Sequence, residues 1–136
     1  MSDDEKHELY PDVLVDSNAT FNRDLLNSMV GPNAKIYVDT NPPQIAFTPV
    51  GHELTVRQKL LVYLLAKKIL VDIEKIEMEG MSPSQIEDET GISGGTIRPI
   101  LGKLAKARLI QKDDEKGGYY VPNYSLERVH EELEEN

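Results

Sequence analysis

The sequence predicts a mainly α protein with a small β-hairpin and a short α+β extension at its N-terminus, so its fold class is α+β. Three observations predict this class. A long apolar pattern at helical spacing covers 55–78, two shorter helical patterns follow between 82 and 107, and an alternating pattern with glycines covers 109–122. The long pattern predicts a central helix that covers the inner sides of the two shorter ones.

The chain has 136 residues, enough for one ordinary domain with an extension. The first residues are charged and have no apolar period, which predicts a disordered tail. A strand pattern gives way to the long helix at 49–51. We therefore divide the chain into an acidic tail at 1–9, an α+β extension at 10–50, a main domain at 51–124 and an acidic C-terminal helix at 125–136.

The extension carries only short patterns. They predict a strand at 13–15, capping side chains at 16–18, a helix at 21–30, and two strands at 34–39 and 44–48 joined by turn residues. These elements are too short to form a core of their own. We expect them to pack on the long helix or on a second subunit.

The central helix is predicted to begin after Thr55, which caps it, with Gln58 at the third helical position. It is predicted to reach 78, with Gly80 as its stop. One face carries the apolar residues Leu61, Leu65, Ile69, Ile73 and Ile76. Leu65 and Ile69 are expected to be almost fully buried.

The same helix is apolar on its other sides too. The residues concerned are Leu60, Tyr63, Leu64, Leu70 and Val71. A helix that is apolar on several sides needs more partners than two short helices provide. The extension is one candidate for that role and a second subunit is the other.

The first short helix has a strong start signal. Ser82 is placed to cap it, Pro83 takes the first helical position, where a missing N–H costs nothing, and Gln85 can reach back to the cap. Gly91 is expected to adopt the left-handed conformation that ends a helix. The helix is therefore held to about two turns.

Ser93 is placed to cap the second helix, with Ile92 and Ile97 packing together across its start. One stripe of this helix is apolar, formed by Ile97, Ile100, Leu101 and Leu104, and the opposite face carries Arg98, Lys103 and Lys106. Pro99 leaves two alternatives. After a cap at Ser93 it lies past the first turn and bends the helix, whereas a cap at Gly95 or Thr96 brings it into the first turn.

After the second helix the period becomes extended. The segments 109–112 and 118–121 alternate like strands, and the charged segment 113–117 between them ends in glycine. The pattern predicts a β-hairpin with a charged tip.

Helix, turn, helix and hairpin in this order resemble the winged helix-turn-helix DNA-binding domains of archaeal and bacterial regulators. The resemblance rests on the residues at 82–85, 91–93, 96–98 and 104–110, followed by the hairpin. It implies that 51–124 is a winged helix-turn-helix domain of a transcriptional regulator whose partner is double-stranded DNA. The helix at about 93–107 would be the recognition helix in the major groove, and the hairpin at 109–122 would be the wing on the DNA backbone.

The expected DNA interface consists of the outward side chains of the recognition helix and the wing. Thr96 and Arg98 are expected to read bases, and the lysines to meet phosphates. The complete set is Ser93, Thr96, Arg98, Lys103, Lys106, Lys112 and Lys116. Glycines and Pro99 occupy much of the same face, so we expect modest specificity with a large contribution from backbone and shape.

The charge distribution bears on this expectation. The net charge of −9 opposes general binding to nucleic acid. From 94 to 122, however, six basic residues face three acidic ones, which gives this segment +3 and leaves −12 for the rest. The alternative reading is a solvated helix exterior. The acidic residues at 113–115 on the wing tip favour a second function, a winged-helix module for protein interaction or assembly without sequence-specific DNA binding.

A homodimer is expected for two reasons. The apolar surface at 60–71 exceeds what two short helices cover, and Leu126, Val129 and Leu133 form a stripe on the C-terminal helix. Similarity to winged-helix regulators, whose first and last helices often pair across a two-fold axis, points the same way.

Other chemistry finds little support in the residues. His7, His52 and His130 lie far apart without a neighbouring ligand, so no metal or other cofactor is expected. No nucleophile has a recognisable base near it, which argues against an enzyme. The chain has no cysteine, no uninterrupted apolar run that would cross a membrane, and an acidic start unlike a signal peptide, so a cytoplasmic location is expected.

Overall fold

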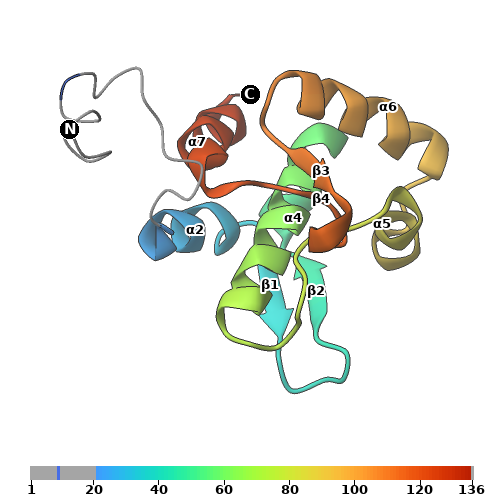
Figure 1. The fold of residues 1–136 in the computed structure, drawn as a ribbon. Coiled ribbons are helices and arrows are strands. Elements are labelled where there is room, and N and C mark those ends of the chain that lie inside the picture. Colours follow the sequence, from blue (N-terminus) through green and yellow to red (C-terminus); the bar gives the residue numbers. More distant parts are fainter. Residues whose placement is uncertain (1–8, 10–20, 136) are drawn as a thin grey trace.

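Helix α4 (Val56–Asp72) lies at the centre of an α+β fold, and the other elements surround it (Figure 1). The computed structural model describes Leu9 and residues 21–135. In that part of the chain the other helices are α2 (Arg23–Val30), α3 (Pro49–His52), α5 (Pro83–Thr90), α6 (Gly94–Lys106) and α7 (Leu126–Glu134). Two antiparallel pairs of strands complete it, β1 (Ala34–Tyr37) with β2 (Gln44–Phe47) and β3 (Gln111–Asp113) with β4 (Gly118–Tyr120).

Most of the acidic tail, the strand predicted at 13–15 and the caps predicted at 16–18 lie outside the described residues. Within the described part, the cap of α2 is Asn22, whose side-chain oxygen accepts from the Leu25 N–H at 3.0 Å. The two strands predicted in the extension are present as β1 and β2, each ending before its predicted limit. The short helix α3 then separates β2 from α4.

The start of α4 confirms the prediction from sequence. The Thr55 hydroxyl accepts from the Gln58 N–H at 3.2 Å, and the Gln58 side chain accepts from the Thr55 N–H at 3.1 Å. Each of these bonds gives a partner to a backbone N–H group at the start of the helix, where no helical carbonyl is available.

The predicted end of α4 at 78 is wrong, because the helix stops at Asp72. Glu74 adopts a positive φ of 61°, and the N–H groups of Lys75 and Ile76 return to the Leu70 carbonyl at 2.9 and 3.4 Å. These bonds close the last turn. Ile73, which lies beyond the end of the helix, is 46% exposed. Ile69 is only partly buried, which contradicts the prediction, whereas Leu65 is fully buried as predicted.

Gly80 has a different role from the predicted helix stop. Its N–H donates to the Lys116 carbonyl at 2.7 Å, and Met81 and Tyr119 exchange two backbone hydrogen bonds of 2.9 Å. A Cβ on Gly80 would lie 2.5 Å from the Lys116 oxygen, so only glycine allows this approach. The segment before α5 is thereby fastened to the second hairpin.

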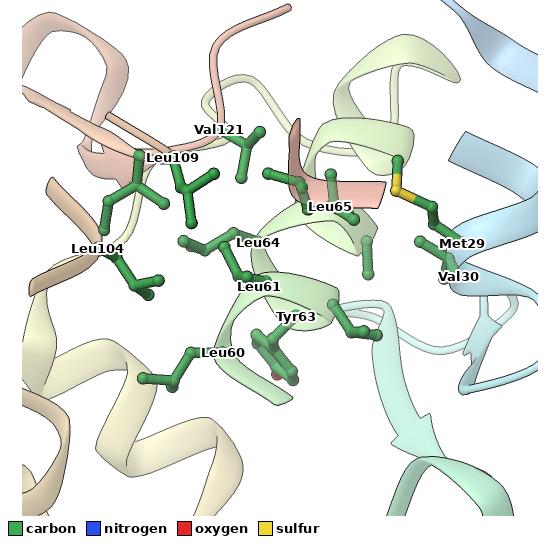
Figure 2. Packing of buried hydrophobic residues seen from close by; sticks show 14 of the residues in the cluster. Met29, Val30, Leu60, Leu61, Tyr63, Leu64, Leu65, Leu104, Leu109 and Val121 are labelled. Atoms are coloured by element: carbon green, nitrogen blue, oxygen red, sulfur yellow. The ribbon is translucent and has the colours of Figure 1, made fainter. Parts of the chain in front are cut away.

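The apolar surface of α4 is buried inside one chain. Every residue of 60–66 is at most 4% exposed. Figure 2 shows Leu61 and Leu64 on the side of the helix towards Leu104 and Leu109, with Met29 and Val30 on the other side. The extension therefore packs on the long helix, the first of the two alternatives.

Helix α7 takes part in the same core. It packs against α2 and α4, and its residues Leu126 and Val129 are at most 2% exposed. The two surfaces from which a homodimer was predicted are thus used largely within the protomer. The dimer itself stays a prediction, and it has lost the observations on which it was based.

Candidate nucleic-acid interface

The two helices of the candidate interface are set by local signals that the sequence carries. Ser82 and Gln85 form the predicted reciprocal cap at the start of α5, with bonds of 3.2 and 3.1 Å. Gly91 ends the helix with a φ of 76°, a conformation that residues with a Cβ rarely adopt. The chain then needs only Ile92 and Ser93 to reach α6.

Helix α6 begins directly after Ser93, whose hydroxyl accepts from the Gly95 N–H at 3.2 Å. This start decides between the two alternatives for Pro99, which lies inside the helix beyond the first turn. Proline there removes one backbone donor from the helix. The helix nevertheless continues to Lys106, because Ile97, Leu101 and Leu104, each at most 1% exposed, fix it on the core.

The outward face of α6 carries the residues predicted for DNA contact. Thr96, Arg98, Lys103 and Lys106 are exposed, as the burial of the opposite stripe requires. Ser93 is also exposed, but its hydroxyl is engaged in the cap. The face between them is shallow, since Gly95, Pro99 and Gly102 are exposed there as well.

A carboxylate from α5 occupies the start of α6. Oε2 of Glu87 accepts a hydrogen bond from the Gly94 N–H. A Cβ placed on Gly94 would lie 2.5 Å from Nη1 of Arg98 and 3.2 Å from Oε2 of Glu87, so both charged groups border this one backbone position. Sequence reasoning did not find Glu87, because the contact joins residues on two helices across the turn.

The second hairpin carries the remaining predicted residues. Lys112 pairs with Tyr119 across the strands, and its Nζ lies 5.9 Å from the centre of that ring. Lys116 lies in the 3₁₀ turn Asp114–Lys116 at the tip, with Nζ 5.5 Å from the centre of the Tyr120 ring. Both lysines are exposed, and each ammonium group lies over an aromatic ring of the hairpin.

The tip itself is acidic. The Asp113 carboxylate accepts from the Glu115 N–H at 2.9 Å, which fixes the turn, while Asp114 and Glu115 are exposed. A DNA backbone approaching the tip would meet these carboxylates beside Lys116. The hairpin thus presents both signs of charge within a few residues.

The base of the hairpin is tied to α4 by buried polar groups that sequence reasoning also missed. Nζ of Lys68 donates to Oδ1 of Asn123 at 2.8 Å and lies 2.9 Å from Oε1 of Glu79. The Lys68 side chain is 6% exposed and that of Glu79 is 11% exposed. The sequence alone does not reveal this pairing, because the partners of Lys68 are remote from it along the chain.

Neither a metal site nor a membrane span is apparent in the described residues. No three of their histidine, aspartate and glutamate side chains are grouped so that they would hold a metal ion. None of the helices in this part of the chain combines the length and apolar character that crossing a bilayer requires.

The seven predicted site residues therefore fall into two groups. Ser93, Thr96, Arg98, Lys103 and Lys106 lie on or at the start of α6, and Lys112 and Lys116 lie on the hairpin that follows it. Comparison of the chain with models of known protein families, with curated proteins and with solved structures found no match.

Proposed function

We propose that this protein is a DNA-binding transcriptional regulator of the winged-helix type. In this proposal α5 and α6 form the helix-turn-helix, α6 enters the major groove as recognition helix, and the hairpin of β3 and β4 is the wing on the backbone. The order of α4, α5, α6, β3 and β4 supports it, as does the short turn between α5 and α6.

The observation that carries the proposal is the position of the basic residues. Six of them lie between 94 and 122, and all six are exposed on α6, the turn after it or the wing: Arg98, Lys103, Lys106, Arg108, Lys112 and Lys116. The segment has a charge of +3 in a chain of −9. Phosphates are the counterpart that such a local excess attracts, since backbone contacts dominate affinity for DNA.

Within this surface the side chains divide by chemistry. Arg98, near the start of α6, has the planar fork that fits a guanine edge, and Thr96 beside it can hydrogen-bond to a base. Lysines form point contacts that suit phosphates. Because exposed glycines and Pro99 leave few other readers, the proposed recognition has modest specificity.

The experiment is a fluorescence anisotropy titration with random duplex DNA at several salt concentrations. Each lysine among Lys103, Lys106, Lys112 and Lys116 that contacts a phosphate is expected, when changed to alanine, to weaken binding to all sequences alike. Each such change should lower the slope of log K against log[salt] by about one. Lys35→Ala, an exposed lysine of β1 in the extension, is the matched control and should leave the slope unchanged.

Arg98 gives a different signature. Arg98→Ala is expected to reduce the preference among duplexes, measured by competition between a selected and a random sequence, by about one to three kcal/mol. Absence of any salt-dependent binding by the wild-type protein at low ionic strength would contradict the whole proposal.

Protein binding is the second candidate, and the acidic groups around α6 favour it. Glu87 occupies the start of the helix, and Asp114 and Glu115 lie exposed at the wing tip. Phosphates would be repelled at both places. In this alternative a partner protein places basic side chains at these two positions and binds while duplex DNA does not.

A further inference from the structure

Lys68 of α4 is a charged residue that the proposed DNA interface does not use. In the part of the chain that the structure describes, it is the one charged residue that is buried. Its Nζ donates to Oδ1 of Asn123 at 2.8 Å and lies 2.9 Å from Oε1 of Glu79. The centre of the Phe21 ring is 5.7 Å from the same atom. One ammonium group therefore joins the central helix to three segments that are remote from one another in the sequence.

The two polar partners of this lysine belong to the two segments that hold the wing. Glu79 directly precedes Gly80, whose N–H donates to the Lys116 carbonyl at 2.7 Å. Asn123 comes shortly after the end of β4 at Tyr120. A single buried side chain thus contacts both the segment that is bonded to the tip of the wing and the segment in which the chain leaves it.

Apolar packing does not fill the space between α4 and the outer part of the wing. A cavity of about 430 Å³ lies there, and its lining includes Lys68 and Val71 from α4 and Lys116 and Tyr120 from the wing. The base of the hairpin, in contrast, lies in the hydrophobic core, to which Val121 belongs (Figure 2). Because interlocking side chains are what normally fixes the distance between two elements, polar contacts at the edge of the cavity take over this role for the outer part.

A buried ion pair is suited to fixing one arrangement. The loss of hydration offsets much of its attraction, so apolar residues of similar size often stabilise a fold as well. The pair nevertheless requires a short distance between its two groups. A displaced wing would draw Glu79 away from Lys68 and leave both charges buried without a partner, which is costly. The ion pair therefore favours one position of the wing over others.

We propose that Lys68 is a positioning residue, which holds the wing where Lys112 and Lys116 reach phosphates of the duplex that α6 reads. It does not touch DNA itself, because its ammonium group is buried against Glu79 and Asn123. The role rests on the DNA-binding function proposed above, since it concerns contacts of the wing with the DNA backbone. Both wing lysines are carried by the same hairpin, so a displaced wing loses their phosphate contacts together.

The test replaces the ion pair by apolar residues of similar size, Lys68→Met together with Glu79→Leu, in the full chain. The replacement changes no net charge and leaves neither member of the pair unpartnered, so the variant is expected to fold. In the anisotropy titration with random duplex DNA, the slope of log K against log[salt] should fall by about one for each wing lysine that contacts a phosphate. The base preference that depends on Arg98 should stay at the wild-type value.

The same replacement in a chain that already carries Lys112→Ala and Lys116→Ala separates positioning from a general loss of folded protein. With both wing lysines absent, replacing the ion pair is expected to leave the slope unchanged and the affinity within about twofold. A purely structural role would weaken binding by the same factor in both backgrounds and alter neither slope. That result would overturn the proposal.

Arg57 and Glu132 provide a matched control. They form an ion pair that joins the start of α4 to α7 and not to the wing, and their side chains are 33% and 22% exposed. Arg57→Met together with Glu132→Leu should leave the slope unchanged. A fall equal to that caused by replacing the pair at Lys68 would indicate a general effect of ion pairs on α4, which overturns the assignment.

Circular dichroism shows whether the replaced pair allows folding. If it does not, Asn123→Ala decides the question, because it removes the neutral partner of Lys68 and keeps the ion pair. It should lower the slope in the same direction, and an unchanged slope would overturn the proposal. Failure of the wild-type protein to bind duplex DNA with any salt dependence removes the DNA-binding function and this role with it. Wild-type binding, together with an unchanged slope in the folded variant, overturns the role of Lys68 alone.

Discussion

Single side chains on α4 fix where the neighbouring elements lie. Tyr63, 4% exposed, donates its hydroxyl to Oε1 of Glu89 at 2.9 Å, and Nζ of Lys67 lies 2.8 Å from the same oxygen. The three residues fasten the last turn of α5 to the central helix. Because α6 follows α5 after a tight turn, this contact also helps to set the direction in which the candidate recognition helix is presented.

The same contact predicts a dependence of stability on alkaline pH. Burial of the side chain and, next, the hydrogen bond to Glu89 raise the pKa of Tyr63 above its ordinary value of 10.0. The unfolded chain ionises at that ordinary value, so the stabilisation is complete below it and is lost as pH rises towards the higher pKa of the folded state. Tyr63→Phe is expected to flatten the fall of the unfolding free energy above pH 10.

Urea unfolding at a series of pH values measures this slope. At neutral pH, Tyr63→Phe should cost about 0.5–1.5 kcal/mol, the usual contribution of one hydrogen bond. Tyr37→Phe is the control, because it makes the same change at a tyrosine that is 52% exposed. Identical alkaline slopes for wild type and Tyr63→Phe would show that Tyr63 ionises equally well in both states.

At the scale of elements, the starts of helices were predictable and one end was not. The caps at Thr55, Ser82 and Ser93 depend on residues within a few positions of each other, so the sequence displays them directly. The end of α4 at Asp72 depends on a positive φ at Glu74. Glycine or asparagine at that position would have indicated such a conformation, but glutamate does not. An apolar period that continued to 78 therefore overstated the helix.

The candidate site shows the same division. The exposed residues of α6 follow from its helical period, and the hairpin follows from alternation and glycines. The contact of Glu87 with Gly94 and that of Lys68 with Glu79 join separate elements, and no spacing rule relates them. Polar partners across elements are set by packing, so only the folded chain displays them.

The position of α4 in the core gives a prediction with an internal comparison. Leu65 is fully buried, whereas Ile69, near the C-terminal end of the helix, is only partly buried. Leu65→Ala should lower the free energy of unfolding by about 2–5 kcal/mol, through lost burial and the cavity that remains. Ile69→Ala should cost less. Chemical denaturation followed by circular dichroism measures both, and an equal or larger cost for Ile69→Ala would contradict this placement.

At the scale of the whole molecule, the extension and α7 complete a single core around α4. Figure 1 shows α2 and α7 on one side of α4 and α5 and α6 on the other. Gln58 of α4 donates to the carbonyls of Glu132 and Glu135, at 3.2 and 2.7 Å, so the end of α7 is bonded to the start of the central helix. Sequence periodicity showed that α4 needed extra partners, but it left open whether these belonged to the same chain.

Removal of α7 is an experiment that distinguishes a helix that completes its own protomer from a helix that joins two protomers. Truncation after Tyr124 removes the buried side chains of Leu126 and Val129, each of which contributes about 1.5–3 kcal/mol on burial. It also removes the 2.8 Å hydrogen bond from the Ser125 hydroxyl to the Arg108 carbonyl. The truncated chain is therefore expected to lose on the order of several kcal/mol of unfolding free energy at any protein concentration.

Urea denaturation at low and high protein concentration, together with sedimentation of the full chain, distinguishes a helix that closes the protomer from one that joins two. Glu127→Ala and Glu131→Ala change exposed residues of the same helix and should have little effect. If α7 instead served a dimer, the full chain would unfold at higher urea as its concentration rises, and truncation would abolish only that dependence. The burial of Leu126 and Val129 against α2 and α4 favours the first result, in which stability falls without any change in association.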